Sequence, residues 1–225
     1  MLRAGGGLTV LYEAIRVVVG NATRAAYRLR VSGLERLPET GGYVIAPSHR
    51  SMMDIPFVGW VVPEPIGYMG KRSLFDIPVL GRAFASLGGI PVERDGSDRK
   101  ALRTALDRIA DGQPMLIFPE GTRDSGAAID DLQPGAAYLA LRAGVPLVPM
   151  GIAGTEEIVR ARRLPVPRFQ RVAVVIGEPL FPPSLSGAVV PRAEVDALTE
   201  RLGVALQQAF DQAYRLRDAG PPPGA

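Results

Sequence analysis

The sequence predicts an α/β domain in which a central mixed, largely parallel sheet is flanked by helices. Short apolar runs alternate with longer amphipathic segments along most of the 225-residue chain. This alternation is typical of α/β proteins. Residues that commonly begin and end helices lie at the ends of the amphipathic segments. For example, Pro134 begins one such segment and Gly144 follows it. A chain of this length is expected to form one domain.

Each expected strand is an apolar run bounded by glycine, proline or polar residues. The strands cover residues 28–31, 43–46, 66–69, 90–92, 115–118, 147–152 and 172–176. Helices are expected at 77–87, 98–110, 134–143 and 192–216, and a further helix begins at Asp54. Pro78 suits the first turn of the helix at 77–87, which ends before Gly88 and Gly89. Asp98 can cap the next helix by accepting from its first backbone N–H groups.

The pattern divides the chain into three parts. Residues 1–30 form an N-terminal segment with one helix over 8–29, or two helices that break near Gly20. An amphipathic helix of this kind either packs against the domain core or lies in a membrane interface with its arginines at the headgroups. Residues 31–217 form the main domain, and 218–225 form a disordered tail rich in proline.

The amino-acid composition excludes several kinds of functional site. The chain has no cysteine and a single histidine, which excludes disulfides, thiolate zinc sites and a cysteine nucleophile. We therefore expect no metal site. No run approaches the roughly 20 apolar residues that span a bilayer. Because no secretory signal is apparent either, we expect the protein to stay on the side of the membrane where it is made.

Arginine dominates the positive charge. The net charge is +3, and Lys71 and Lys100 are the only lysines. Arginine binds phosphate through a planar fork, which suits anionic substrates and lipid headgroups. Five arginines lie within residues 160–171 among Leu, Val and Phe, without an acidic residue. This segment favours an anionic bilayer surface, or it is an exposed loop that keeps the protein soluble. No nucleic-acid motif lies beside it, so we expect no nucleic-acid partner.

The single histidine, His49, follows an apolar strand, and Asp54 lies five residues further on. Histidine has the unperturbed pKa closest to neutral, and a carboxylate can fix its tautomer. On one continuous helix the two side chains would point about 140° apart. They can meet if His49 lies in the loop after the strand and Asp54 opens the next helix. The alternative is that Asp54 only caps that helix and His49 is incidental.

A second polar segment follows the strand at 115–118. Gly121 allows a tight turn whose N–H groups can surround an anion. Thr122 offers a hydroxyl, and Arg123 can clamp a phosphate. Glu120 would repel phosphate, so we expect it to orient Arg123 or a substrate hydroxyl. The alternative is an ordinary turn with a surface ion pair.

Two more cations follow strands: Lys71 and Arg94. Each is a surface cation if taken alone. If the strands are parallel neighbours, however, both cations and His49 converge, because sites in α/β proteins gather at the carboxyl ends of strands.

Together these segments resemble the glycerolipid acyltransferase family, of which lysophosphatidic acid acyltransferases are the commonest. The resemblance rests on His49-(x)4-Asp54, on 89–94 (Gly-Ile-Pro-Val-Glu-Arg), on 118–123 (Phe-Pro-Glu-Gly-Thr-Arg) and on 145–149 (Val-Pro-Leu-Val-Pro), in that order. The stretch from Lys71 through 74–81 is also similar, and the likeness covers residues 31–179. The chain departs from the family in Ser48, where asparagine is usual, and in Asp124, where serine is usual.

The resemblance implies a role for each position. His49 is the general base that takes the proton from the acceptor hydroxyl as it attacks a thioester carbonyl, and Asp54 orients it. Lys71 binds the acceptor phosphate or stabilises the oxyanion, and 145–149 lines the acyl-binding part. The acceptor phosphate is held by Arg94 and by the segment Glu120-Gly121-Thr122-Arg123.

The implied activity is transfer of an acyl chain from an acyl thioester to the sn-2 hydroxyl of lysophosphatidic acid, which gives phosphatidic acid. The thioester is acyl-CoA or an acyl carrier protein, and no further cofactor is expected. The chain has neither a cysteine nor a G-x-S-x-G elbow, which favours direct attack over an acyl-enzyme. We expect the protein on the cytoplasmic face of the membrane, bound to its anionic surface. The alternatives are another acceptor, such as glycerol 3-phosphate, or a non-catalytic lipid-binding module.

Overall fold

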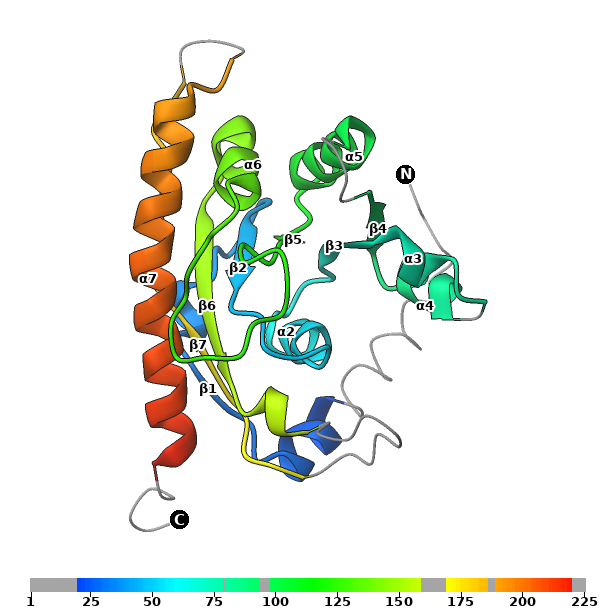
Figure 1. Ribbon diagram of the computed structural model, residues 1–225, viewed down its shortest axis with the longest axis vertical. Coiled ribbons are helices and arrows are strands. Elements are labelled where there is room, and N and C mark those ends of the chain that lie inside the picture. The colour runs from blue at the N-terminus through cyan, green and yellow to red at the C-terminus, as the bar shows by residue number, and fades with distance from the viewer. Residues whose placement is uncertain (1–19, 79, 94–97, 159–168, 186–188, 220–225) are drawn as a thin grey trace.

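The computed structural model describes residues 20–78, 80–93, 98–158, 169–185 and 189–219. Seven strands form one sheet in the order β1-β7-β6-β2-β5-β3-β4 (Figure 1). All pairs are parallel except β6 and β7, so the expectation of a mixed, largely parallel sheet is confirmed. The strands are β1 (Arg30–Ser32), β2 (Val44–Pro47), β3 (Gly67–Lys71), β4 (Gly89–Val92), β5 (Met115–Leu116), β6 (Leu147–Ala153) and β7 (Ala173–Ile176).

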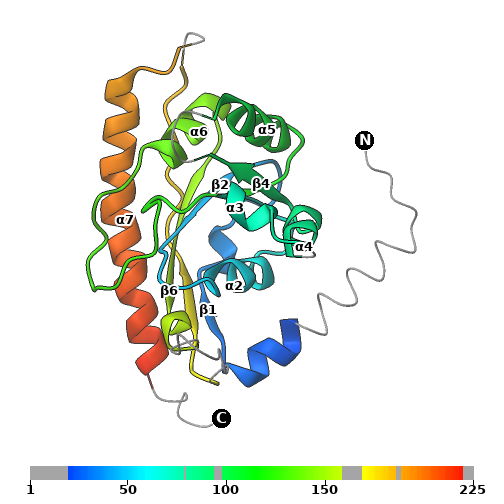
Figure 2. The same cartoon turned by 45° about the vertical axis from the view of Figure 1, so that its right-hand side comes forward.

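Helices cover both faces of this sheet (Figure 2). They are α2 (Asp54–Val61), α3 (Arg72–Phe75), α4 (Leu80–Ser86), α5 (Arg99–Ala110), α6 (Gly135–Ala143) and α7 (Arg192–Asp218), with 3-10 turns η1 (Leu34–Arg36) and η2 (Thr155–Glu157). Successive side chains of β2 point to opposite faces of the sheet. Val44 and Ala46 pack toward α5, α6 and α7. Tyr43 and Ile45 pack in the second core, with α2.

The helix caps follow the expected chemistry in two places. The Asp98 carboxylate accepts from the N–H of Ala101 at 3.0 Å, at the start of α5. Gly144 ends α6 with a φ of +66°, in the left-handed region that glycine enters without strain. The helix expected at 77–87 is shorter, and α3 precedes it without having been predicted. Gly81 permits that arrangement, because a Cβ there would lie 1.9 Å from the carbonyl oxygen of Phe75.

The N-terminal segment is described only in its last part. Residues 20–26 are helical, and the residues before Gly20, which would decide between one helix and two, lie outside the described part. The helix was expected to reach residue 29 but ends at 26, because residues 27–28 form a turn that leads into β1. Residues 8–19 of the expected helix, the tail from 220 and most of the arginine-rich segment lie outside the described residues. Tyr27 joins this segment to the domain through an edge contact with Phe57, at 5.4 Å between ring centroids. Within the described ranges, no helix has the length and hydropathy to cross a membrane.

Candidate active site

The carboxyl ends of β2, β3, β5 and β6 lie at one edge of the sheet, because these strands run parallel. The loop after β2 carries His49, the segment after β5 carries Glu120, and the turn after β6 carries Thr155. Parallel topology therefore gathers polar residues from distant parts of the chain at this edge, as in other open α/β sheets.

His49 and Asp54 meet in the loop that leaves β2. The imidazole Nδ1 lies 2.9 Å from Oδ2 of Asp54. The carboxylate is fully buried, whereas the imidazole is 13% exposed. The loop makes this contact possible, because Asp54 is the first residue of α2 and His49 precedes the helix. The imidazole also stacks on the ring of Phe118, with centroids 3.7 Å apart and planes at 20°.

The Asp54 carboxylate faces back over the loop. Its Oδ2 also accepts from the backbone N–H groups of Arg50 and Ser51, at 2.8 Å each. Its Oδ1 accepts from the hydroxyl of Thr155. Both N–H groups precede the helix, and the N-cap of α2 is Met53, which makes no side-chain cap. Asp54 therefore organises the histidine loop, and the alternative of a simple helix cap does not describe it.

Glu120 and Arg50 form a buried ion pair beneath the histidine. Their side chains are 3% and 2% exposed. Glu120 Oε1 accepts from the backbone N–H of His49 at 2.7 Å, and Oε2 accepts from the Arg50 guanidinium. Arg50 also donates to the carbonyl of Ala128 at 2.9 Å and lies 4.7 Å over the ring of Phe210. The side-chain hydrogen bonds of Glu120 within the described ranges thus go to the histidine loop and not to Arg123.

The turn after β5 places its other members toward solvent. Gly121 has a φ of +68°, which glycine adopts without strain and other residues rarely do. Thr122 and Arg123 are exposed. The N–H of Asp124 donates to the carbonyl of His49 at 3.1 Å. This turn is therefore joined to the histidine loop, with an arginine on its outer side.

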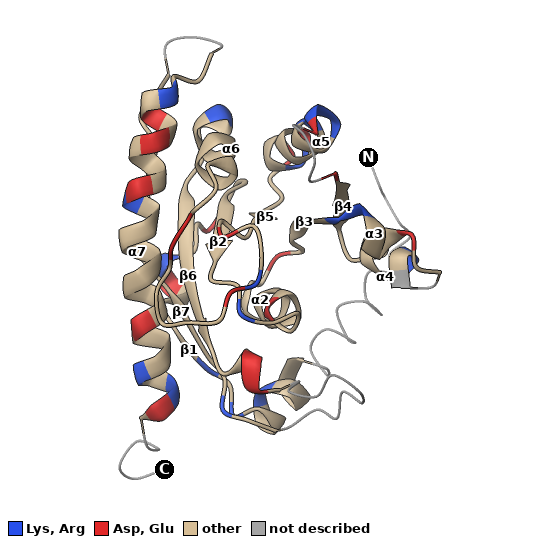
Figure 3. Ribbon diagram, viewed as in Figure 1, with Lys and Arg blue, Asp and Glu red and all other residues tan. Residues whose placement is uncertain are grey.

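The remaining predicted cations are only partly described. Lys71 ends β3 and is exposed. Figure 3 shows basic residues in blue near the start of α3. Arg72, which follows Lys71, pairs with Glu93 at the end of β4. Arg94 lies outside the described residues. The structure brings His49, Asp54 and Glu120 into contact, and it leaves Lys71 and Arg123 exposed at the ends of neighbouring strands.

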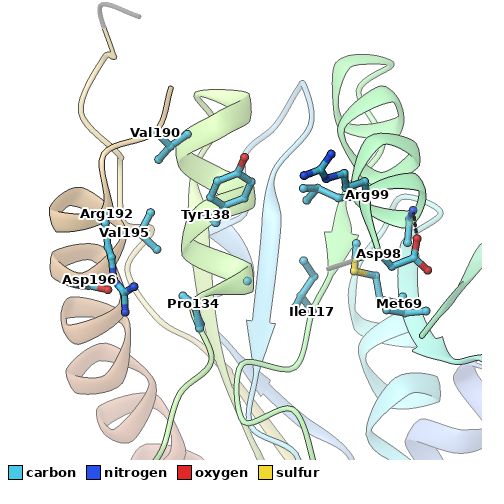
Figure 4. Close-up of a pocket in the computed structure, with 14 residues that line it drawn as sticks. Met69, Asp98, Arg99, Ile117, Pro134, Tyr138, Val190, Arg192, Val195 and Asp196 are labelled. Atoms are coloured by element: carbon cyan, nitrogen blue, oxygen red, sulfur yellow. Dashed lines mark hydrogen bonds and ion pairs between the residues drawn. The ribbon is translucent and has the colours of Figure 1, made fainter. Parts of the chain in front are cut away.

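A cavity of about 590 Å³ opens between α5 and α6 (Figure 4). Met69 and Ile117 form part of its wall, and Tyr138 and Arg99 point toward one another across it. Ile117 packs in the core on the side of α5, α6 and α7, whereas the next residue, Phe118, packs in the core with α2 and stacks on the imidazole. No cluster of three or more metal-binding side chains occurs in the described part of the chain.

Sequence reasoning missed Arg50 and Thr155. Arg50 stands beside the histidine, but its partners lie 70 and 78 residues further along the chain. Thr155 follows β6 at the same edge of the sheet, so the rule used for the other strand ends could have found it.

Comparison with known proteins decides the family. The family model described as "Acyltransferase" matches residues 28–153, which is more than half of the chain. The chain belongs to the acyltransferase family. A crystal structure of the 1-acyl-sn-glycerophosphate acyltransferase PlsC from Thermotoga maritima has the same fold, with a TM-score of 0.66 and 22% identity over 93% of this chain and 84% of that chain.

Several curated relatives carry the same name. The chain is 29% identical to a 1-acyl-sn-glycerol-3-phosphate acyltransferase of Bacillus subtilis, over 84% of this chain and 91% of that protein. It is 30% identical to a protein of the same name from Chlamydomonas reinhardtii, over 72% of this chain and 49% of that protein. The chain spans about half the length of the plant and algal relatives that it matches.

Proposed function

We propose that this chain is an O-acyltransferase that moves an acyl chain from an acyl thioester to the sn-2 hydroxyl of lysophosphatidic acid, which gives phosphatidic acid. The observation that carries the proposal is the 2.9 Å contact of His49 with Asp54 at the carboxyl edge of the sheet, in a member of the acyltransferase family. A non-catalytic lipid-binding module would have no need of this dyad. We take lysophosphatidic acid as the acceptor because the relatives are named 1-acyl-sn-glycerol-3-phosphate acyltransferases.

The geometry suits a general base. Asp54 as a carboxylate can only accept hydrogen bonds, so His49 donates through Nδ1 and keeps its lone pair on Nε2. Nε2 takes the proton of the acceptor hydroxyl while the oxygen attacks the thioester carbonyl. The C–S bond then breaks, and the thiolate leaves with the proton returned from the imidazolium. Base catalysis of this kind contributes about 10²–10⁴-fold.

Two exposed cations support recognition of a phosphate. Lys71 is the last residue of β3, at the carboxyl end of a strand that pairs in parallel with β5. Arg123 precedes Asp124, whose N–H donates to the carbonyl of His49. We assign the acceptor phosphate to these cations, together with Arg94. We leave Glu120 out of the proposed phosphate site, because its two carboxylate oxygens accept from the backbone of His49 and from the Arg50 guanidinium.

The cavity beside Ile117 is the place for an acyl chain. Its size lies within the 300–1,000 Å³ range of small-ligand sites, and apolar side chains such as Met69, Ile117 and Val195 line it. Membrane attachment through the N-terminal segment and the arginines of 160–171 also remains part of the proposal. Sedimentation with anionic vesicles at low and high salt tests that attachment, which should weaken as salt screens the charges.

The acceptor test uses purified protein, one acyl-CoA and two acceptors that differ in a phosphate group: lysophosphatidic acid and the matching monoacylglycerol. We expect transfer to lysophosphatidic acid with a higher kcat/KM. The Arg123→Met variant should raise KM for lysophosphatidic acid and leave KM for acyl-CoA unchanged. An equal or higher kcat/KM for monoacylglycerol would contradict the phosphate site. A preference for glycerol 3-phosphate would keep the reaction class and change the acceptor.

A further inference from the structure

Thr155 lies fully buried behind the dyad. It is the first residue of η2, which follows β6 after Gly154. Its hydroxyl donates to Oδ1 of Asp54. The other carboxylate oxygen receives His49 Nδ1 and two backbone N–H groups. Among the hydrogen bonds of the described residues, the one from Thr155 is the single bond that Oδ1 receives.

This bond has a specific geometric consequence. The last torsion of an aspartate side chain is broad and roughly two-fold, so the rotamer alone does not set the plane of the carboxylate. Donors on both oxygens set that plane. Since Oδ2 is the oxygen that meets His49, a rotation of the Asp54 carboxylate would change the angle and length of the contact with the imidazole.

The turn that carries Thr155 is itself held in place. Gly154 has a φ of +92°, and a Cβ there would lie 2.2 Å from the carbonyl oxygen of Arg171. The N–H of Gly154 donates to Glu156 at 3.1 Å. Glu156 in turn accepts from the hydroxyl of Tyr214 on α7 at 2.8 Å. Burial, and then Glu156, raise the pKa of Tyr214 above its ordinary 10.0.

We infer that Thr155 is a positioning residue for the proposed reaction: its hydroxyl fixes the plane of the Asp54 carboxylate and thereby the orientation of His49. The inference rests on the proposed function, because it assigns Thr155 a part in activating the same base. Thr155 acts through Asp54 and touches no reacting atom.

A matched pair of variants tests it. Thr155→Val keeps the shape and removes the hydroxyl, whereas Thr155→Ser keeps the hydroxyl. Small misplacements of catalytic groups cost on the order of 10²-fold in rate. We expect Thr155→Val to lower kcat by about 10- to 100-fold with KM for lysophosphatidic acid within twofold of the wild-type value, and Thr155→Ser to recover most of that loss. Thr199→Val, which removes a hydroxyl bonded within α7, is the control and should keep the wild-type kcat.

A spectroscopic measurement needs no substrate. Because the chain has one histidine, protein labelled with 15N-histidine gives imidazole signals that belong to His49 without assignment. We expect Thr155→Val to shift the Nδ1 signals and Thr155→Ser to leave them near the wild-type positions. Wild-type kcat together with wild-type signals in Thr155→Val would overturn the inference, and so would a fall in kcat with unchanged signals.

Two further results separate the possible failures. If His49→Ala retains full activity, the proposed base is wrong, while the imidazole signals still decide whether Thr155 positions the dyad. If Thr155→Val does not fold, Thr155→Ser and Thr155→Cys replace it as the pair, because a thiol is a much weaker donor than a hydroxyl. Equal kcat and equal signals in those two variants would then overturn the inference.

Discussion

The substitution Glu120→Gln removes one charge from the pair with Arg50 and changes almost nothing in shape. The amide oxygen can still accept from the backbone N–H of His49, but the guanidinium loses its carboxylate. Both side chains are at most 3% exposed, so water cannot replace the lost partner. Breaking a buried pair by removing one partner costs about 3–5 kcal/mol. Arg50 keeps the carbonyl of Ala128 and the ring of Phe210, which places the cost near the lower value.

A loss of about 3 kcal/mol in the free energy of unfolding corresponds to roughly 6–12 °C in Tm for a chain of this size. Thermal unfolding followed by circular dichroism measures it. The control is Glu178→Gln, at a pair whose side chains are 32% and 76% exposed. Such a surface pair contributes at most about 1 kcal/mol, so its Tm should change far less.

The double variant Arg50→Met with Glu120→Gln completes the design. Without the guanidinium there is no unpaired buried charge, so the double variant should melt above Glu120→Gln alone. A Glu120→Gln variant that melts within 2 °C of the wild type would refute the reasoning. It would also be refuted if the losses of stability in Arg50→Met and in Glu120→Gln simply added in the double variant.

Two further predictions concern the frame around the site. Gly151→Ala should destabilise the fold by about 1–3 kcal/mol through overpacking, because a Cβ there would lie 2.1 Å from the carbonyl oxygen of Ala209. The control is Gly135→Ala, whose added Cβ meets nothing within 4 Å and should leave Tm unchanged or higher. Equal Tm values in the two variants would contradict this packing. Hydrogen bonds to Asp98, first from the N–H of Ala101, lower its pKa from the ordinary 3.8, so the carboxylate contributes stability above that pH and loses it as the pH falls through the lowered pKa. Asp98→Ala should therefore lower Tm at pH 7, and the difference from the wild type should close in acid; a difference that is constant with pH would exclude the cap.

The strands could be predicted from the sequence because each is a short apolar run between turn residues, and apolar runs are local. The meeting of His49 with Asp54 could also be predicted, since five residues fit only a loop followed by a helix start. The order of the strands could not, because the pattern does not say which neighbours pair. In particular, nothing in the two apolar runs predicts that β6 and β7 pair in antiparallel orientation.

The buried partners of the dyad depend on that unpredicted order. Thr155 reaches Asp54 across 101 residues of sequence, and Arg50 reaches Glu120 across 70. Glu120 was expected to orient Arg123 or a substrate hydroxyl, since charge alone favours the arginine three residues on. The fold instead carries the Glu120 carboxylate under the histidine loop, where it pairs with Arg50.

The most direct test of the central claim, that the imidazole of His49 takes the acceptor proton, is the rate of phosphatidic acid formation by His49→Ala. The account predicts a fall of at least about 10²-fold, with the protein still folded because the Asp54 carboxylate keeps its hydrogen bonds from Arg50, Ser51 and Thr155. A His49→Ala variant that is folded and forms phosphatidic acid within tenfold of the wild-type rate would contradict it.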